Sequence, residues 1–561
     1  MKKPVSIGIE NYKELIDKSY YYVDKTLLIK DLLDLKEKAI LFTRPRRFGK
    51  TLALSMMKTF FEDERDGQGE QMDNRHYFHG MKIEQAGEAY MQYAGQYPVI
   101  SFSLKSAKQP DFNMAYESLK DEIIKEYERH AYILGKGILS EENEKRYHDV
   151  MRRLASPVLY AKALEFLSDC LKKYHNKNVI ILIDEYDVPL ENAYFSGFYE
   201  QMTQFIRSLF ESALKTNDSL EFAVITGCLR ISRESIFTGL NNLRISSVLN
   251  ENYGEYFGFT ESEVEAMLTF YDMEAKMNEV RQWYDGYLFG DAEVYNPWSV
   301  LNYVSDHARG GSSYPRPYWS NTSSNSIIRE LIEKADMGIR REVEELVSGG
   351  TIEKPIHEEI TYEDIHRTQD NLWNFLFFTG YLKAVSTRFE VDTLYLTMRI
   401  PNEEVKYIYR NSISEWFQQS VQSTDFSELF QALIKGEAAT VESVIKQQLQ
   451  KSISYHDNAE KFYHGFLLGL LSGMQNYEVI SNRESGDGRP DIMLKPLDEK
   501  QPAVILELKR TDRFNQMEAM CDKALVQIEE QRYEEGLLDE GYGKIIKYGI
   551  CFCKKSCMVK R

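Results

Sequence analysis

A chain of 561 residues is too long for a single hydrophobic core, so several domains are expected. A net charge of −18 opposes general affinity for nucleic acid, because polyanions repel one another. The hydrophobic share of 43% is ordinary for a soluble protein, no apolar run approaches the roughly 18 residues that span a bilayer, and six cysteines do not make a disulfide framework. These features predict a cytoplasmic protein without a membrane partner.

The first chemical motif is a basic loop between an apolar strand, residues 40–43, and a helix over residues 52–61. In loops of this kind, backbone N–H groups and a helix N-terminus face an anion, a lysine reaches the terminal phosphates, and a threonine hydroxyl meets Mg²⁺. The template GxxxxGK(S/T) has glycine where this chain has Arg44, which would add positive charge beside the phosphates. The loop residues predicted to contact nucleotide are Arg44, Arg46, Arg47, Phe48, Gly49, Lys50 and Thr51.

A run of apolar, mostly β-branched residues at 179–183 ends in Asp184 and Glu185. Such a run predicts a buried parallel strand, and ligands bind at the carboxyl edge of open α/β sheets. We therefore expect Asp184 to hold Mg²⁺ through water and Glu185 to polarise the water that attacks the γ-phosphate. The alternative is a strand-end carboxylate that only caps a helix.

Two further strands are predicted at residues 97–104 and 221–227, with a helical region over 112–174 between them. The second of these strands ends near Thr226, the candidate sensor of the γ-phosphate. Arg230 and Arg233 follow, and either is placed to offset transition-state charge; Arg230 is our candidate for nucleotide contact. An ordinary strand end and surface arginines are the alternatives.

Four segments together resemble the bacterial AAA-ATPase-like family. They are Tyr-Val-Asp-Lys-Thr at 22–26, Arg-Pro-Arg-Arg-Phe-Gly-Lys-Thr at 44–51, Ile-Asp-Glu-Tyr-Asp at 183–187, and the run from Thr-Gly-Cys-Leu-Arg to Asn-Asn-Leu at 226–243. The resemblance implies a divergent AAA-type ATPase module joined to a C-terminal nuclease-like domain. It also implies that the first loop glycine is regularly replaced, so Arg44 is compatible with a working loop.

The middle of the chain is rich in aromatic residues and tight turns. Residues 251–360 are expected to form a helical lid over the nucleotide. From 361 to 450, an apolar helix at 372–378 and a hairpin over 381–401 suggest a winged-helix-like linker followed by polar helices. A joining role is favoured over DNA binding, because no basic recognition helix is present.

A second chemistry is predicted in residues 451–561. Asp491 stands at the head of a strand, and Glu507 and Lys509 are two apart on the next strand, so they project to one face. Asp491 and Glu507 would hold Mg²⁺ against a phosphodiester, and Lys509 would orient water or stabilise developing charge. His464, four residues after Glu460 on one helix face, is a further candidate metal ligand.

The pattern Pro-Asp…Glu-x-Lys resembles the PD-(D/E)xK nuclease superfamily. The resemblance implies a catalytic role for Gln527, on a helix that continues to Tyr533, and a restriction-endonuclease-like fold. An ordinary α/β edge with an ion pair between Glu507 and Lys509 is one alternative, and an inactive nuclease-like fold is another.

The predicted fold class is α/β, with a P-loop NTPase sheet of AAA/ASCE type, a helical lid, a winged-helix-like linker and a C-terminal α/β nuclease-like domain. The predicted boundaries are 1–250, 251–360, 361–450 and 451–561. The expected cofactors are ATP and Mg²⁺ and the expected polymer partner is DNA; a homo-oligomer is compatible with the sequence. We expect ATP to gate or position a Mg²⁺-dependent nuclease, in phage or mobile-element defence by the resemblance. The alternatives are a nucleotide-gated signalling module and a scaffold whose nuclease-like domain binds DNA or a partner without cleaving it.

Overall fold

A computed structural model describes residues 2–66, 69–229, 236–237, 240, 242–308, 314–321, 328, 337–358, 368–422, 425–451, 460–471, 473–481 and 490–561. The chain divides into two compact units. The first unit comprises Met1–Ser323 and Glu353–Lys406, and the second comprises Ser324–Ile352 and Tyr407–Arg561. Each unit is described separately.

The first unit is built on a five-stranded sheet in which every pairing is parallel, in the order β2-β3-β4-β1-β5. Its strands are β1 (Ala39–Thr43), β2 (Val99–Ser103), β3 (Val179–Asp184), β4 (Leu220–Gly227) and β5 (Leu243–Ser246). Every residue of β1 and β3 is buried, as expected for central strands covered on both faces. The strands predicted at 40–43, 97–104, 179–183 and 221–227 are confirmed.

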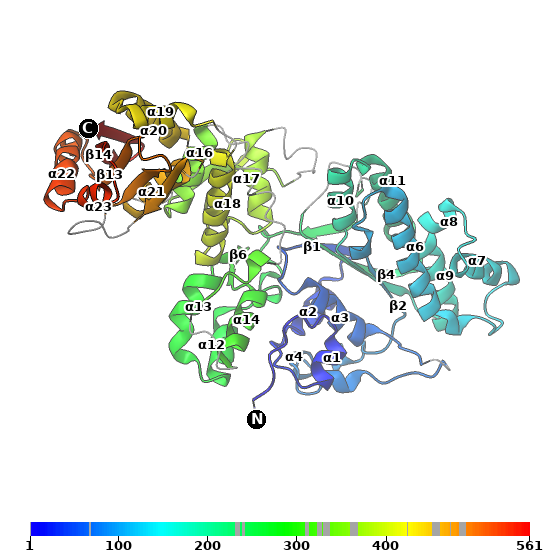
Figure 1. The fold of residues 1–561 in the computed structure, drawn as a ribbon. Helices are drawn as coiled ribbons and strands as arrows, with labels where there is room; N and C mark the ends of the chain where they lie inside the picture. The colour runs from blue at the N-terminus through cyan, green and yellow to red at the C-terminus, as the bar shows by residue number, and fades with distance from the viewer. Residues whose placement is uncertain are drawn as a thin grey trace. The chain divides into compact units, whose positions relative to one another are not determined.

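Helices cover both faces of this sheet. In Figure 1, α1, α2 and α3 lie on one side of the strands, and α6, α10 and α11 lie on the other. The helices of this part are α1 (Tyr12–Asp17), α2 (Leu27–Leu35), α3 (Lys50–Phe61), α4 (Lys82–Gln85), α5 (Glu88–Met91), α6 (Phe112–Arg129), α7 (Glu141–Met151), α8 (Pro157–Ala161), α9 (Ala163–His175), α10 (Val188–Ser196) and α11 (Tyr199–Phe210).

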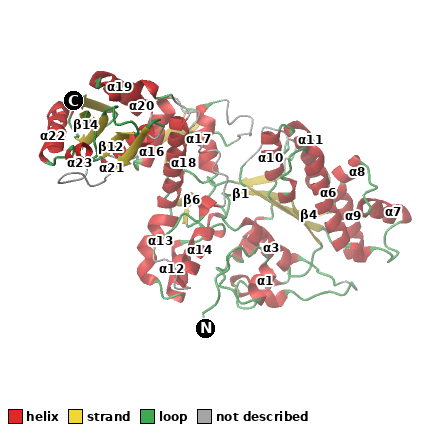
Figure 2. Ribbon diagram, viewed as in Figure 1, coloured by secondary structure: helices red, strands yellow, loops and turns green. Residues whose placement is uncertain are grey.

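The rest of the first unit combines short helices with two small sheets, which Figure 2 colours by type. Strands β6 (Tyr287–Phe289) and β7 (Ala292–Val294) form a hairpin beside the helices α12 (Glu261–Phe270), α13 (Met277–Tyr284) and α14 (Pro297–Ala308). These helices share an apolar core of their own that includes Val264, Leu268, Val300 and Tyr303.

The predicted helix and hairpin after residue 361 are confirmed as α17 (Gln369–Phe378), β9 (Lys383–Glu390) and β10 (Thr393–Arg399). The hairpin is part of a three-stranded sheet in the order β8-β10-β9, where β8 is Ile352–Pro355. Helix α18 (Glu403–Gln422) follows.

The second unit holds a mixed sheet in the order β11-β12-β13-β14-β15. Only β13 and β14 pair in parallel, and the other neighbours are antiparallel. The strands are β11 (Tyr477–Ser481), β12 (Ile492–Pro496), β13 (Ala503–Arg510), β14 (Ile545–Cys553) and β15 (Ser556–Lys560). The helices are α16 (Met337–Val347), α19 (Ser427–Lys435), α20 (Ala438–Lys451), α21 (Glu460–Leu471), α22 (Met517–Glu530) and α23 (Glu535–Asp539).

One face of this second sheet packs on α19, α20 and α21 through residues such as Leu506 and Ile550. The opposite face packs on α22, and there Gly549 lies so close to the helix that an added Cβ would stand 2.4 Å from the carbonyl oxygen of Cys521. Alternation along β13 directs Glu507 and Lys509 to this second face, beside α22.

Candidate nucleotide and metal sites

The basic loop after β1 has the backbone of an anion cradle. Arg47 and Gly49 both have positive φ values, 72° and 83°, and Gly49 is the residue that precedes the first turn of α3. Alternation of left-handed and right-handed residues turns successive N–H groups to one side, and the first N–H groups of α3 have no partner within the helix. Glycine at position 49 is explained by its left-handed backbone, which a β-carbon would strain.

Lys50 lies inside the loop, with its side chain folded back on the backbone. Its ammonium donates to the carbonyl oxygens of Arg44 and Pro45, both at 2.8 Å, and lies 3.7 Å from the sulfur of Cys228. The residue is 7% exposed. The ammonium is therefore held at the mouth of the predicted phosphate site by neutral carbonyl oxygens, which a phosphate can replace as acceptors.

Asp184 is the point at which the predicted residues meet. Thr51 Oγ1 donates to Asp184 Oδ2 at 2.7 Å, and Thr226 Oγ1 donates to Asp184 Oδ1. The backbone N–H of Glu185 also donates to Oδ1, at 3.0 Å. The structure thus brings Thr51, Asp184 and Thr226 together from α3, β3 and β4, since β4 lies between β1 and β3.

This triad of side chains is compatible with a divalent cation. When its hydroxyl donates to Asp184, Thr51 keeps its oxygen lone pairs free to act as a ligand. A site with one carboxylate and one hydroxyl suits Mg²⁺, which retains several waters and takes further ligands from phosphates.

Glu185 directly follows β3 with a left-handed backbone, φ 53°, which is uncommon for a residue other than glycine. Burial raises the pKa of its carboxyl, and the neighbouring Asp184 raises it further, while Lys105 and Lys50 lower it. A carboxylate with a raised pKa is a better proton acceptor, as a water-polarising group requires.

Arg44 is buried without exposed surface. Its guanidinium donates to the carbonyl oxygens of Ser246 at 2.7 Å and Thr43 at 2.9 Å, and it lies over the rings of Phe257 and Phe289 at 5.3 and 5.2 Å. Burial lowers the pKa of this guanidinium to about 9. These contacts hold the guanidinium of Arg44 inside the protein, and its contact with nucleotide stays a prediction.

The other basic and aromatic loop residues also have protein partners. Arg46 forms an ion pair with Glu191, and Arg47 lies 4.3 Å above the ring of Trp298. Phe48 is buried against Tyr287 and Phe289. Their predicted contacts with nucleotide stay predictions.

Arg230 and Arg233 lie outside the described residues. Tyr186 and Asp187, for which the motifs predicted no role, contact the two residues that follow β4. The signal that could have pointed to them is the second aspartate of Asp-Glu-Tyr-Asp, three residues after the end of the strand.

In the second unit, the structure brings Asp491, Glu507 and Lys509 together where β12 and β13 meet. Asp491 Oδ2 accepts from the backbone N–H of Leu508 at 2.8 Å, and Lys509 Nζ donates to Glu507 Oε1 at 2.9 Å. Glu507 is 2% exposed, and its second oxygen, Oε2, is buried without a hydrogen-bond partner in the described part of the chain. A buried carboxylate oxygen without a donor is the atom that a cation would satisfy.

Burial raises the pKa of Glu507, and Asp491 raises it further, whereas Lys509 lowers it. Two acids that oppose one another's ionisation are a setting in which a cation stabilises both charged forms. Across the ranges that the structure covers, no group of three His, Cys, Asp or Glu side chains is arranged to hold a metal. Asp491 and Glu507 therefore fit a cation that takes its other ligands from water or phosphate.

The side chain of His464, on α21, contacts the backbone carbonyl group of Asp491. Its Nε2 lies 3.0 Å from the carbonyl oxygen of Asp491 and 3.0 Å from Ser481 Oγ. A carbonyl only accepts, so Nε2 is the protonated nitrogen in this arrangement. Gln527 donates from its amide to the hydroxyl of Tyr533 at 3.2 Å. Metal binding by His464 and catalysis by Gln527 stay predictions.

Comparisons with known proteins match two separate parts of the chain, one containing the candidate nucleotide site and the other the candidate nuclease site. Residues 6–237 match a family described as "Predicted AAA-ATPase", and residues 458–561 match the PD-(D/E)XK nuclease superfamily. An uncharacterized protein in the vnfD 5′ region of Azotobacter chroococcum mcd 1 is 26% identical over 334 residues, which cover 59% of this chain. The match spans 56% of that relative's length. Among the helices that the structure describes, none has the length and apolar character to cross a membrane.

Proposed function

Because residues 6–237 belong to the predicted AAA-ATPase family and residues 458–561 to the PD-(D/E)XK nuclease superfamily, we propose that this protein binds and hydrolyses ATP to control a Mg²⁺-dependent DNA nuclease. The proposal includes a division into an ATPase module (1–250), a helical lid (251–360), a winged-helix-like linker (361–450) and a nuclease domain (451–561). A role in defence against phage or mobile DNA is the biological context proposed from the resemblance.

The observation that carries the ATPase proposal is the convergence of Thr51 and Thr226 on Asp184. The N–H groups of the loop and Lys50 bind the phosphates, and Glu185 accepts a proton from the attacking water. Bound Mg²⁺ supplies charge neutralisation at the phosphates, and Thr51 and Asp184 are the residues that would hold it.

The nuclease proposal is supported by Oε2 of Glu507, which lies beside Asp491 and has no hydrogen-bond partner among the described residues. These two carboxylates would hold Mg²⁺, which supplies Lewis-acid activation of the phosphodiester. Lys509 is held 2.9 Å from Glu507 and offers an ammonium to the developing charge.

A second candidate function is a nucleotide-gated module whose nuclease-like domain binds DNA or a partner without cleavage. The net charge of −18 favours it, because a general nuclease must first overcome repulsion between two polyanions. The two candidates differ in a single observable, the breaking of phosphodiester bonds.

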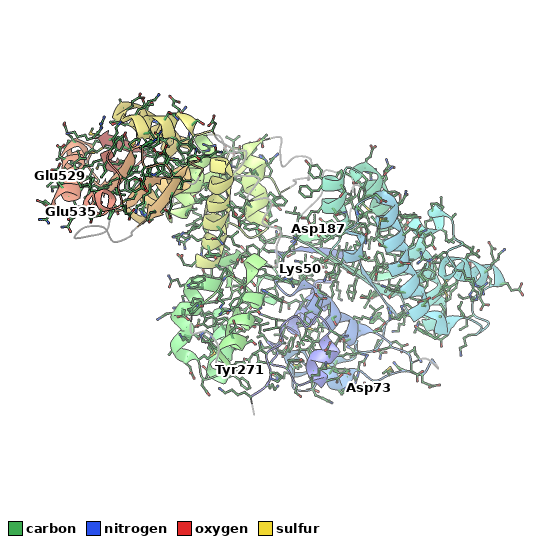
Figure 3. The ribbon with its side chains drawn as sticks, in the orientation of Figure 1. Lys50, Asp73, Asp187, Tyr271, Glu529 and Glu535 are labelled. Carbon is green, nitrogen blue, oxygen red and sulfur yellow. The ribbon has the colours of Figure 1, made fainter. Side chains whose placement is uncertain are left out.

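The decisive experiment incubates the full chain with linear, nicked and single-stranded DNA, with and without Mg²⁺ and ATP. Glu507→Ala should abolish cleavage, while the matched control Glu529→Ala, at an exposed acid on α22 that Figure 3 labels, should cleave normally. Lys50→Ala should abolish ATP turnover, while Lys173→Ala, at an exposed lysine on α9, should not. DNA that is bound but never cut would establish the second candidate, and ATP turnover unchanged in Lys50→Ala would refute the ATPase assignment.

A further inference from the structure

The segment from Thr226 to Leu229 comprises the last two residues of β4 and the two that follow. It lies between Asp184 and Lys50, the two residues that would bind the cation and the phosphate of ATP. At one end, Thr226 donates its hydroxyl to Asp184. Two residues further along the chain, the sulfur of Cys228 lies 3.7 Å from the ammonium of Lys50. One short segment therefore contacts both the acid that would hold the cation and the lysine that would hold the phosphate.

Tyr186 and Asp187 hold this segment in place through its backbone. Asp187 Oδ2 accepts from the N–H groups of Cys228 at 2.7 Å and Leu229 at 3.2 Å. The hydroxyl of Tyr186 donates to the carbonyl oxygen of Leu229, and its backbone N–H donates to the carbonyl oxygen of Thr226 at 3.1 Å. Four hydrogen bonds thus join Tyr186 and Asp187, shortly after β3, to the end of β4 and the two residues that follow it.

The packing around this clamp is tight. Tyr186 has no exposed surface and Asp187 is 3% exposed. A β-carbon at Gly227 would stand 2.4 Å from the Tyr186 ring and 2.9 Å from Asp187 Oδ1, closer than real contacts allow. Glycine at position 227 is therefore a requirement of the clamp. Lys50 and Asp187 are both labelled in Figure 3.

We propose that Tyr186 and Asp187 are positioning residues for ATP turnover, because they fix the segment that sets Thr226 against Asp184 and Cys228 against Lys50. This inference rests on the proposed ATPase function. Tyr186 and Asp187 act through the backbone of residues 226–229, so their loss should lower kcat more than it weakens ATP binding. The first N–H groups of α3, which would bind phosphate, belong to another element than the clamp, so ATP affinity should change less than kcat.

A rival role for Asp187 is direct chemistry, as a metal ligand or a base. Its second oxygen, Oδ1, is buried without a hydrogen-bond partner among the residues that the structure describes, so the rival needs a test. The two roles respond differently to asparagine. An amide oxygen still accepts from Cys228 and Leu229, whereas an amide is neither a base nor a good ligand for Mg²⁺.

The experiment measures ATP affinity by calorimetry and kcat by phosphate release, on full-length variants with Mg²⁺. Asp187→Ala should lower kcat at least tenfold with Kd changed less than twofold, Asp187→Asn should keep at least a third of the kcat, and Tyr186→Phe should lower kcat about threefold to tenfold. The control Asp111→Ala removes another carboxylate that accepts a backbone N–H, at the start of α6, and should leave kcat unchanged.

Two results would overturn the inference. Equal loss in Asp187→Asn and Asp187→Ala would assign Asp187 to direct chemistry, and unchanged kcat in both Asp187→Ala and Tyr186→Phe would show that the clamp is dispensable. If Asp187→Ala does not fold, Tyr186→Phe and Asp187→Asn decide the matter. A wild-type protein that neither binds nor hydrolyses ATP would refute the proposed function itself, which is a distinct outcome.

Discussion

Glu404 gives the sharpest prediction for stability, because it is a buried acid for which the described residues provide no ion-pair partner. It has no exposed surface, and it accepts from Ser299 Oγ at 2.8 and 3.0 Å and from the backbone N–H of Trp319 at 2.8 Å. Burial raises its pKa to about 8 against these hydrogen bonds, which lower it. The folded first unit therefore holds Glu404 as a neutral acid at neutral pH.

The sign of the pH dependence follows from this shift. A folded-state pKa above the unfolded value of 4.5 means that the folded state binds the extra proton between these two values. The contribution of Glu404 to stability is complete below pH 4.5 and is lost as the pH rises toward 8. The free energy of unfolding should fall by up to about 1.4 kcal/mol per pH unit within this window, or roughly 3 kcal/mol between pH 4.5 and 7.

Glu404→Gln should remove this loss, because a neutral amide keeps the acceptor oxygen and never ionises. The assay is urea unfolding followed by tryptophan fluorescence from pH 5 to 9; four of the five tryptophans, at 283, 298, 319 and 373, belong to the first unit. We expect the variant to gain about 4 kcal/mol over wild type at pH 8 and less than about 1 kcal/mol at pH 5. The control Glu403→Gln changes a partly exposed neighbour. Parallel pH curves for wild type and Glu404→Gln would refute the reasoning.

Three further changes test the candidate sites. Thr226→Val removes the hydroxyl that donates to Asp184 and should lower ATP turnover about tenfold, or about 1.4 kcal/mol, with ATP affinity unchanged by calorimetry. Arg44→Lys should destabilise the first unit by about 2 kcal/mol in urea unfolding, because an ammonium cannot replace the planar guanidinium that bonds Ser246 between two aromatic rings. Asp491→Asn should abolish Mg²⁺-dependent DNA cleavage on gels while ATP turnover persists, and cleavage at the wild-type rate would count against the site.

The parallel sheet could be predicted from the sequence because its strands are short runs of apolar, mostly β-branched residues. Residues 179–183 are apolar and lie on a central strand. The polar residue Asp184 ends this strand at the carboxyl edge of the sheet, where ligands bind. Gly49 could also be predicted from the sequence, since it is part of the Gly-Lys-Thr motif. The structure explains the glycine, because the residue before α3 has a left-handed backbone. These features depend on local chain chemistry, which a single sequence contains.

The protein contacts of Arg44 come from distant segments, which explains why the sequence could not predict them. Its partners are Ser246 on β5 and the rings of Phe257 and Phe289, more than 200 residues along the chain. A basic residue beside a phosphate loop suggests anion contact until these partners are known. The contact between Thr226 and Asp184 has the same origin, because only the sheet order places β4 next to β3.

The two proposed metal sites differ in how far the protein itself satisfies their carboxylates. Both oxygens of Asp184 accept hydrogen bonds from protein donors, whereas Oε2 of Glu507 is buried without one in the described structure. An unsatisfied buried acceptor costs about 1–3 kcal/mol, and a cation that binds it recovers that cost as stability. Mg²⁺ without ATP should therefore slow hydrogen exchange in β13 and β14 more than in β3. Glu507→Gln should abolish that protection, and equal protection in wild type and variant would show that Glu507 is not the ligand.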